Sequence, residues 1–244
     1  MQVYREIPKI TNQERRLPAD LVGIVSVADK WTVARHREKS DEIIESTDIP
    51  FVLDAGTGMY LNSILLDTDL APEVPPEVRN KAQSLARNSL NPRRASRGIE
   101  LDLTGATKRG SIWDGDLRYD TVLIYLRPDK TTLDSNISPR SRQLTLSGFE
   151  EAREIMDLDR EGITPNDSVK ESIGLKELTD HLNGNTSIEE AEQKICSRTR
   201  KLARRQIRWF DKLARTIESR TDLLIVEDLS NLDLKHILHD TMEG

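Results

Sequence analysis

A glycine-threonine-glycine turn is the first feature of the sequence whose residue types could do chemistry. It lies in DAGTGMYL, at Asp54–Leu61, after an apolar run and before a helical pattern. Two glycines let the backbone bend and approach a ligand, and the amides at the start of the next helix favour an anion or the polar edge of a base. Since parallel sheets also use glycine-rich turns simply to connect a strand to a helix, the turn alone leaves a purely structural role open.

A basic segment near the carboxyl end is the second feature. Between Lys194 and Arg215, nine Lys or Arg residues stand against the single acid Asp211, so this segment carries +8 and the rest of the chain −14, for a net charge of −6. Phosphate binding depends on where positive charge lies more than on the total, so the segment predicts a polyanion site. A solvated helix face is the alternative, and the scarcity of acidic partners one turn away disfavours it.

The elements that must position these residues alternate between short apolar runs and amphipathic stretches, which is the pattern of an α/β protein with a parallel sheet. Four apolar runs predict strands: Leu21–Val27, Pro50–Asp54, Asp120–Leu126 and Asp222–Val226. Three- and four-residue spacing predicts helices over Val33–Ile44, from about Met59, and over Glu77–Ala86. The stretch Asp129–Gln143 is polar, contains Pro139 and indicates a helix only weakly.

The clearest helical pattern carries the basic segment. Apolar or small residues recur at helical spacing from Ile188 to Leu213, with Ser187 as the expected N-cap and Glu190 completing a capping box. Trp209 falls on the apolar stripe of this helix, which favours a core anchor over a base-stacking group.

Several classes of protein are excluded or disfavoured by composition. No window approaches the roughly 18 uncharged apolar residues of a membrane span, and the first residues lack the apolar run of a signal peptide. The single cysteine, Cys196, cannot form an internal disulfide and is expected to be a buried apolar residue. His236 and His239 are spaced like metal ligands but have no evident third ligand, so a surface helix is favoured. We therefore expect a cytoplasmic protein with no membrane contact.

Read together with the turn, six further motifs resemble the tRNA dimethylallyltransferase family, the bacterial tRNA isopentenyltransferases. In order they are MQVYR at the start, VPPEVR at Val74–Arg79, NPRRASRGIEL at Asn91–Leu101, SGFEEAR at Ser147–Arg153, IGLKEL at Ile173–Leu178 and TRKLARRQIRWF at Thr199–Phe210. The resemblance covers essentially the whole chain, and its last motif is the most specific.

The resemblance implies an activity, a fold and partners. The family transfers the dimethylallyl group of dimethylallyl diphosphate to the exocyclic amine of the adenosine on the 3′ side of the anticodon, with Mg²⁺. Its fold is related to P-loop nucleoside-triphosphate enzymes. The partners implied are therefore the tRNA anticodon stem-loop and dimethylallyl diphosphate, and we expect a monomer.

Site residues follow from the resemblance only where a motif of this sequence matches. Residues expected to contact tRNA are Met1, Gln2, Thr57, Arg79, Arg93, Arg94, Ala95, Ser96, Arg97, Arg204, Arg205, Gln206 and Trp209. Arg153 lies near the family's diphosphate-binding arginine, in a segment one residue short of the family pattern.

The resemblance also places part of the family's machinery outside the printed sequence. Its glycine-rich phosphate loop and its general-base aspartate would precede Met1, and no G-x-x-x-x-G-K-[ST] occurs elsewhere, so no catalytic residue is predicted within the chain. The expected division is an α/β core at 1–70 lacking its first βα unit, a shortened helical insertion at 71–92, and the rest of the core with the basic helix at 93–244.

Two alternatives stay open at this point. The chain could be a catalytically inactive tRNA-binding fragment or truncated paralogue, or a relative of the nucleotide kinases, which share the fold. The sequence 5′ of the first codon would discriminate among them.

Overall fold

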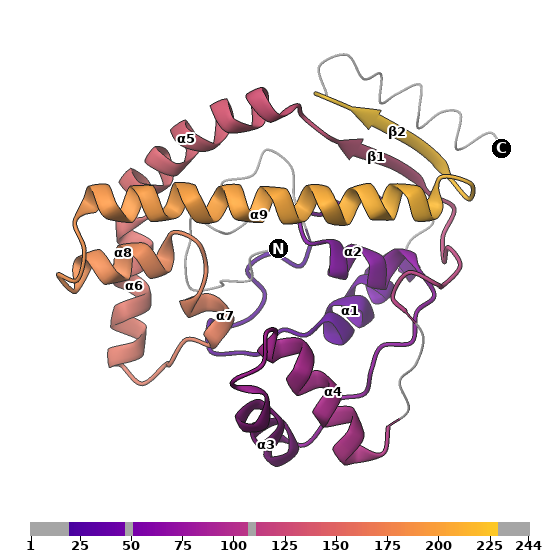
Figure 1. Ribbon diagram of the computed structural model, residues 1–244, viewed down its shortest axis with the longest axis horizontal. Helices are drawn as coiled ribbons and strands as arrows, with labels where there is room; N and C mark the ends of the chain where they lie inside the picture. Colours follow the sequence, from indigo (N-terminus) through magenta and orange to yellow (C-terminus); the bar gives the residue numbers. More distant parts are fainter. Residues whose placement is uncertain (1–19, 47–50, 107–110, 229–244) are drawn as a thin grey trace.

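The structure, a computed structural model, describes residues 20–46, 51–106 and 111–228, which form nine helices and two strands (Figure 1). In chain order they are α1 (Val33–Glu45), α2 (Gly58–Leu65), α3 (Pro76–Ala86), α4 (Pro92–Thr104), β1 (Val122–Leu126), α5 (Lys130–Ser147), α6 (Phe149–Arg160), α7 (Asp167–Lys170), α8 (Leu175–Leu182), α9 (Ile188–Ile217) and β2 (Asp222–Val226). Of these helices, none is both long and apolar enough to cross a membrane.

The long helix α9 organises the molecule. It runs across the full width of the view in Figure 1, with α2 and the strands along one half and α5 and α8 along the other. Its start is the predicted capping box: the Ser187 hydroxyl accepts from the amide of Glu190 at 3.1 Å, and the Glu190 carboxylate accepts from the amide of Ser187 at 3.0 Å. The sequence prediction of this helix is confirmed.

The sheet is parallel and smaller than the sequence indicates. Within the described residues, β1 and β2 pair in parallel, with Val122 opposite Asp222 and Leu126 opposite Val226, as two of the four apolar runs predict. The expected strands at Leu21–Val27 and at 51–54 are wrong, since neither segment is extended and paired; Pro50 lies outside the described residues.

A specific feature of the backbone explains the first of these errors. Leu21 and Gly23 have φ of 59° and 65°, in the left-handed region, which interrupts an extended run. The carbonyl of Val27 accepts hydrogen bonds from the amide and the side chain of Asn166, where a strand would pair with a neighbour. Val27 is nevertheless fully buried, so its apolar character reports a packed loop.

Two apolar clusters form the core. The first joins α2 to α9 and β1, and its buried members are Leu61, Leu65, Leu66, Leu213 and Ile217. The second packs Val27 against Ile155 of α6 and Val169 of α7. The first cluster brings the Gly-Thr-Gly turn, which immediately precedes α2, against the basic helix.

The helices α3 and α4 pack on each other as a hairpin that extends below α9 in Figure 1. Asn91 caps α4 by accepting from the amide of Arg94 at 3.2 Å, Pro92 occupies the first turn, and Gly105 ends the helix at φ 66°. The hairpin spans the predicted boundary at residue 92, and the division into an insertion and a core stays a prediction.

The weakly indicated stretch after β1 is a helix. Asp129 caps α5 by accepting from the amides of Thr131 and Thr132, and the helix continues through Pro139 to Ser147. Packing against α9 holds the segment in place, and this explains how it tolerates an internal proline and polar composition that disfavour an isolated helix.

Candidate nucleic-acid interface

The turn Gly56–Gly58 lies directly against α9. The Gln206 side-chain amide donates to the carbonyl of Gly56 at 2.8 Å. A Cβ at Gly58 would lie 2.0 Å from Cδ1 of Trp209, so this position must be glycine for the indole to pack there. The structure therefore brings together three of the predicted site residues, Thr57, Gln206 and Trp209, from segments about 150 residues apart.

Trp209 is half-buried and packs against α2 and the segment before β1, the inward orientation that its place on the apolar stripe predicts. Its indole N–H donates to Oδ1 of Asn62 at 3.1 Å, and its ring lies 4.9 Å, centroid to centroid, from that of Trp113. Asn62 is fully buried and donates in turn to the carbonyl of Ile112 at 3.2 Å. Sequence reasoning missed Asn62 and Trp113; the signal for Asn62 is one amide in the otherwise apolar face of α2.

Thr57 is exposed, and its hydroxyl does not cap the start of α2. Its backbone is extended at φ −111° and ψ 101°, as an N-cap residue requires, but its side chain accepts no capping hydrogen bond. The hydroxyl at this turn is thus available to a ligand.

The basic segment divides into paired and unpaired cations. Arg198 donates to the buried carboxylate of Glu177 and to the carbonyl of Glu171, and Arg200 pairs with Asp134 at 3.4 Å. Arg204, Arg205 and Arg208 are exposed, and among the residues that the structure describes no carboxylate lies within ion-pair distance of them. The three arginines form the outer row of α9.

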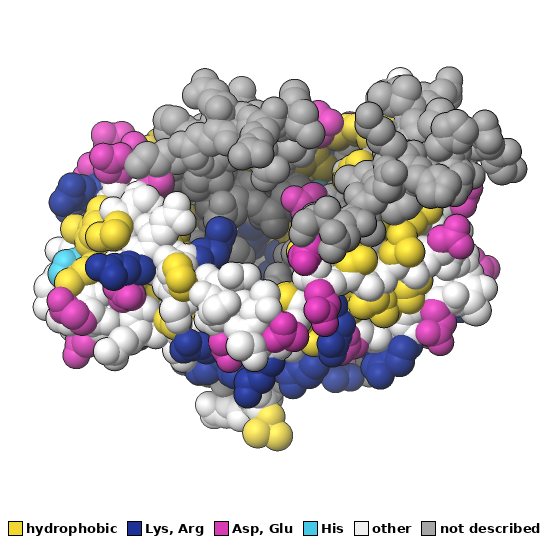
Figure 2. Space-filling view, turned by 90° about the horizontal axis from the view of Figure 1, so that it is seen from above, with side chains coloured by type: hydrophobic (Ala, Val, Ile, Leu, Met, Phe, Trp, Pro, Cys, Tyr) yellow, Lys and Arg dark blue, Asp and Glu magenta, His cyan; other side chains and the backbone are white. Residues whose placement is uncertain are grey.

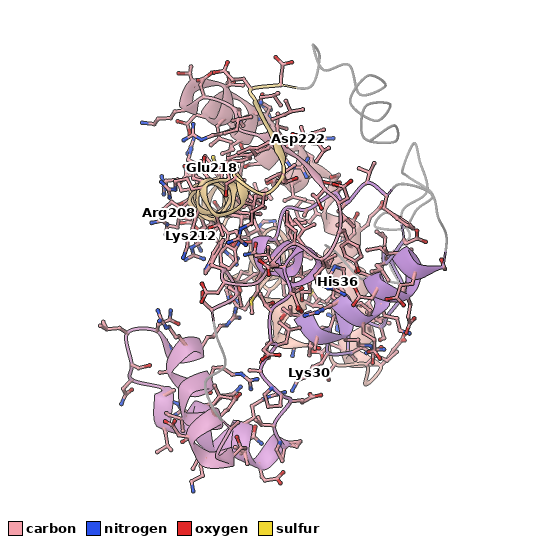
Figure 3. The ribbon with its side chains drawn as sticks, turned by 90° about the vertical axis from the view of Figure 1, so that its right-hand side faces the viewer. Lys30, His36, Arg208, Lys212, Glu218 and Asp222 are labelled. Carbon is pink, nitrogen blue, oxygen red and sulfur yellow. The ribbon has the colours of Figure 1, made fainter. Side chains whose placement is uncertain are left out.

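Two views of the molecule show where the cations of α9 lie. Figure 2 shows Lys and Arg side chains in a row along the edge of the molecule where α9 lies. Figure 3 looks along α9 and shows Arg208 and Lys212 on its outer side, away from α1 and His36. The α3–α4 hairpin extends to the same side. A polyanion that follows α9 would therefore meet the outer row first.

Asp211, the single acid of the basic segment, is paired with two side chains at the end of β1 and directly after it. Asp211 accepts from Nε of Arg127 at 2.8 Å and from the hydroxyl of Tyr125 at 3.0 Å. The hydrogen bond from Arg127 holds the pKa of the Asp211 carboxyl below its usual range, while burial and the bond to Asp211 raise the pKa of Tyr125 to about 12. Asp211 therefore subtracts little from the positive field of α9, and sequence reasoning missed Arg127.

The predicted contacts on the α3–α4 hairpin differ in their exposure. Arg93 and Arg94 are exposed at the start of α4, Ala95 is half-buried and Ser96 is buried. Arg79 and Arg97 both pair with the buried carboxylate of Glu100, at 3.9 Å and 2.6 Å. Of the four predicted arginines on the hairpin, Arg93 and Arg94 are thus exposed, and Arg79 and Arg97 hold the hairpin together.

The remaining predicted residues are placed as follows. Arg153 is exposed on α6, on the far side of the molecule from α2 in Figure 1. Met1, Gln2, His236 and His239 lie outside the described residues. Cys196 is half-buried, near the hydroxyl of Ser138.

The described residues contain no cluster of metal-ligating side chains. Within residues 20–46, 51–106 and 111–228, no group of three or more His, Cys, Asp or Glu side chains converges on one point. Since Mg²⁺ is usually held by one or two carboxylates together with water and substrate phosphates, the Mg²⁺ that the resemblance implies stays a prediction.

Comparison of the chain with known proteins gives relatives with one activity in their names. A tRNA dimethylallyltransferase from Rubrobacter xylanophilus is 51% identical over 240 residues, which are 98% of this chain and 82% of that protein. A tRNA dimethylallyltransferase from Bacillus cytotoxicus is 28% identical over 245 residues, covering 86% of this chain and 76% of that protein.

Solved structures share the fold. The crystal structure of a tRNA delta(2)-isopentenylpyrophosphate transferase from Staphylococcus epidermidis superposes with a TM-score of 0.60 at 21% identity, over 96% of this chain and 83% of that one. That of a tRNA isopentenylpyrophosphate transferase from Bacillus halodurans gives 0.59 at 21% identity, over 93% and 77%. Residues 2–213 match the IPP transferase family, and together with the relative at 51% identity this establishes that the chain belongs to that family.

Proposed function

We propose that the chain transfers a dimethylallyl group from dimethylallyl diphosphate to the exocyclic amine of the adenosine 3′ of a tRNA anticodon. The observation that carries the proposal is the joining of an exposed Gly-Thr-Gly turn to a helix whose outer row of arginines has no carboxylate partner among the described residues. The names of the relatives support the same activity.

Transfer of a dimethylallyl group to adenine in a tRNA requires both the turn and the outer row of α9. An adenine amine is a poor nucleophile, and its ring is stacked in the anticodon loop, so the base must leave the stack and have its edge held by hydrogen bonds. The free hydroxyl of Thr57 can donate and accept at such an edge. The outer row of α9 would hold the phosphates on either side, which positions the RNA without reading its sequence.

We further propose roles for the other predicted site residues, and a fold type, an oligomeric state and a location for the chain. The exposed Arg93 and Arg94 would extend the RNA-binding surface onto the α3–α4 hairpin. Binding of the diphosphate by Arg153 stays a prediction of the family resemblance, since α6 lies away from α2 in Figure 1. A core of the P-loop type, a monomeric state and a cytoplasmic location follow from the family resemblance.

The test is transfer of label from dimethylallyl diphosphate to an anticodon stem-loop RNA. We expect label in the RNA that carries adenosine 3′ of the anticodon. We expect none when the adenine is replaced by unsubstituted purine, the same ring system without the exocyclic amine. RNA that binds but takes up no label would favour the alternative, a tRNA-binding protein without catalysis. An RNA that neither binds nor is labelled would refute both.

A further inference from the structure

Helix α9 has an inner face that touches the turn and, bordering it, an exposed face that carries the arginines; Arg205 lies one turn before Trp209. Gln206 and Trp209 are three residues apart and so lie on one side of the helix, and both contact the segment Gly56–Asn62. Arg204, Arg205 and Arg208 are exposed. One rigid element therefore joins the surface for phosphates to the turn that offers Thr57.

The contacts of the inner face leave the turn little freedom. The amide of Gln206 is 2.8 Å from the Gly56 carbonyl, and a Cβ at Gly56 would lie only 3.2 Å from the same nitrogen. At Gly58 the indole of Trp209 fills the space that a side chain would need. The turn cannot move along α9 without breaking the hydrogen bond or displacing the indole.

The indole is itself fixed from outside α9. Its N–H is bonded to Asn62, a fully buried residue that is also bonded to the carbonyl of Ile112. The ring of Trp113 packs on it, and the ammonium of Lys212 lies 4.3 Å from the centre of the Trp113 ring. Trp209 thus has one available position, set by α2 and the segment before β1.

We infer that Gln206 and Trp209 are positioning residues, which hold the Gly56–Gly58 turn in fixed register with the outer row so that an RNA bound by its phosphates presents its base to Thr57. This inference rests on the proposed function and assigns to the two side chains a role other than direct contact with RNA. Gln206 and Trp209 affect the RNA only through the turn, whereas the arginines bind the phosphates of the RNA directly.

The role can be separated from phosphate binding by measuring two quantities for each variant of the full chain. The first is the preference for a stem-loop RNA with adenosine 3′ of the anticodon over the same RNA with purine there. The second is the salt dependence of binding to either RNA. We expect the wild type to prefer adenosine by about two- to tenfold, the effect of one net hydrogen bond.

Gln206→Met removes the donor to Gly56 at nearly constant length and adds no charge beside the arginines, and Trp209→Phe removes the donor to Asn62. We expect both variants to lose most of the preference while the slope of affinity against salt stays that of the wild type. The matched control is Arg204→Ala, which should lower the slope by about 0.7 to 0.9 and leave the preference unchanged.

A second set of variants covers the case in which the first variants unfold. Gly58→Ala places a methyl group where the indole lies, so it should reduce the preference in the wild type. In Trp209→Ala the atoms that an added Cβ would meet are gone, and Gly58→Ala should then cause no further loss. Melting temperatures of all variants, measured alongside, show whether each one is folded.

The outcomes separate the inference from the function on which it rests. If Gln206→Met and Trp209→Phe keep the wild-type preference, or weaken both RNAs equally, the positioning role is wrong while RNA binding stands. A wild type that binds the two RNAs alike also overturns the inference, because the turn would then read no base. If Arg204→Ala leaves the salt slope unchanged, the proposed RNA-binding function of α9 fails.

Discussion

Glu100 is a buried carboxylate between two arginines that the family resemblance assigns to tRNA. It is 2.6 Å from Arg97 and 3.9 Å from Arg79, with 8% of its side chain exposed. Glu100→Gln leaves both cations without their buried partner, so we expect it to lower the free energy of unfolding by about 1–3 kcal/mol. Urea denaturation of the two proteins measures the difference.

The matched control uses the second carboxylate near Arg79. Glu73 lies 3.7 Å from the same guanidinium but is 77% exposed, so water screens the pair. Glu73→Gln should change the free energy of unfolding by at most about 1 kcal/mol. Equal losses in the two variants would show that burial does not strengthen the contact of Glu100.

His36 predicts a pH dependence of stability. It is 4% exposed between Trp31 and Tyr60, and burial lowers the pKa of the imidazole to about 4 from an ordinary 6.5. The unfolded chain therefore binds this proton at a higher pH than the folded chain. Stability is complete above about pH 6.5 and falls as the pH decreases toward 4, by up to about 1.4 kcal/mol per unit.

The measurement for His36 is chemical denaturation between pH 7 and pH 4, the window set by its two pKa values. His36→Gln removes the titrating group, so its stability should change less steeply over this range than that of the wild type. Stability curves that stay parallel would show that His36 does not resist protonation in the folded protein.

At the scale of the element, helices were easier to predict than strands. The capping box of α9 and the helical spacing of α1 are local signals, and both are confirmed. A run of apolar residues is a less specific signal, because it indicates that the segment is buried but not which backbone conformation the segment adopts. The run at Leu21–Val27 is a loop that Asn166 holds, and this partner lies 139 residues away from Val27.

Two glycines, one inside α4 and one directly after it, give opposite predictions. Gly98 lies inside the helix, where an added Cβ would meet nothing within 4 Å, whereas Gly105 ends the helix at φ 66°. Gly98→Ala should raise the free energy of unfolding by about 0.5–1 kcal/mol through helix propensity. Gly105→Ala should lower it by about 1–2 kcal/mol, since a Cβ disfavours the left-handed conformation. Thermal melts compare the two, and a shift in the same direction for both would contradict this account.

At the scale of the whole molecule, the family motifs located the candidate interface but not the function of each side chain in it. Spacing along α9 put Trp209 on the apolar stripe, and this is confirmed. It could not show that Arg198 and Arg200 bind within the protein, because Glu177 and Asp134 come from other helices. The partners Asn62, Trp113 and Arg127 were missed for the same reason: their contacts join segments far apart in the chain.

The division of the basic segment leads to the last prediction. If Arg204 and Arg205 contact phosphates, binding of an anticodon stem-loop RNA releases counterions and weakens with salt, with a slope of roughly −0.7 to −0.9 per phosphate neutralised. Replacing both by Ala should flatten that slope by about one to two units and weaken all RNAs alike. The control is Arg200→Ala, which removes a charge from the same helix but one that pairs with Asp134 at 3.4 Å. A salt titration in which the control flattens the slope as much as the outer row does would mean that total charge, and not the free face of α9, attracts the RNA.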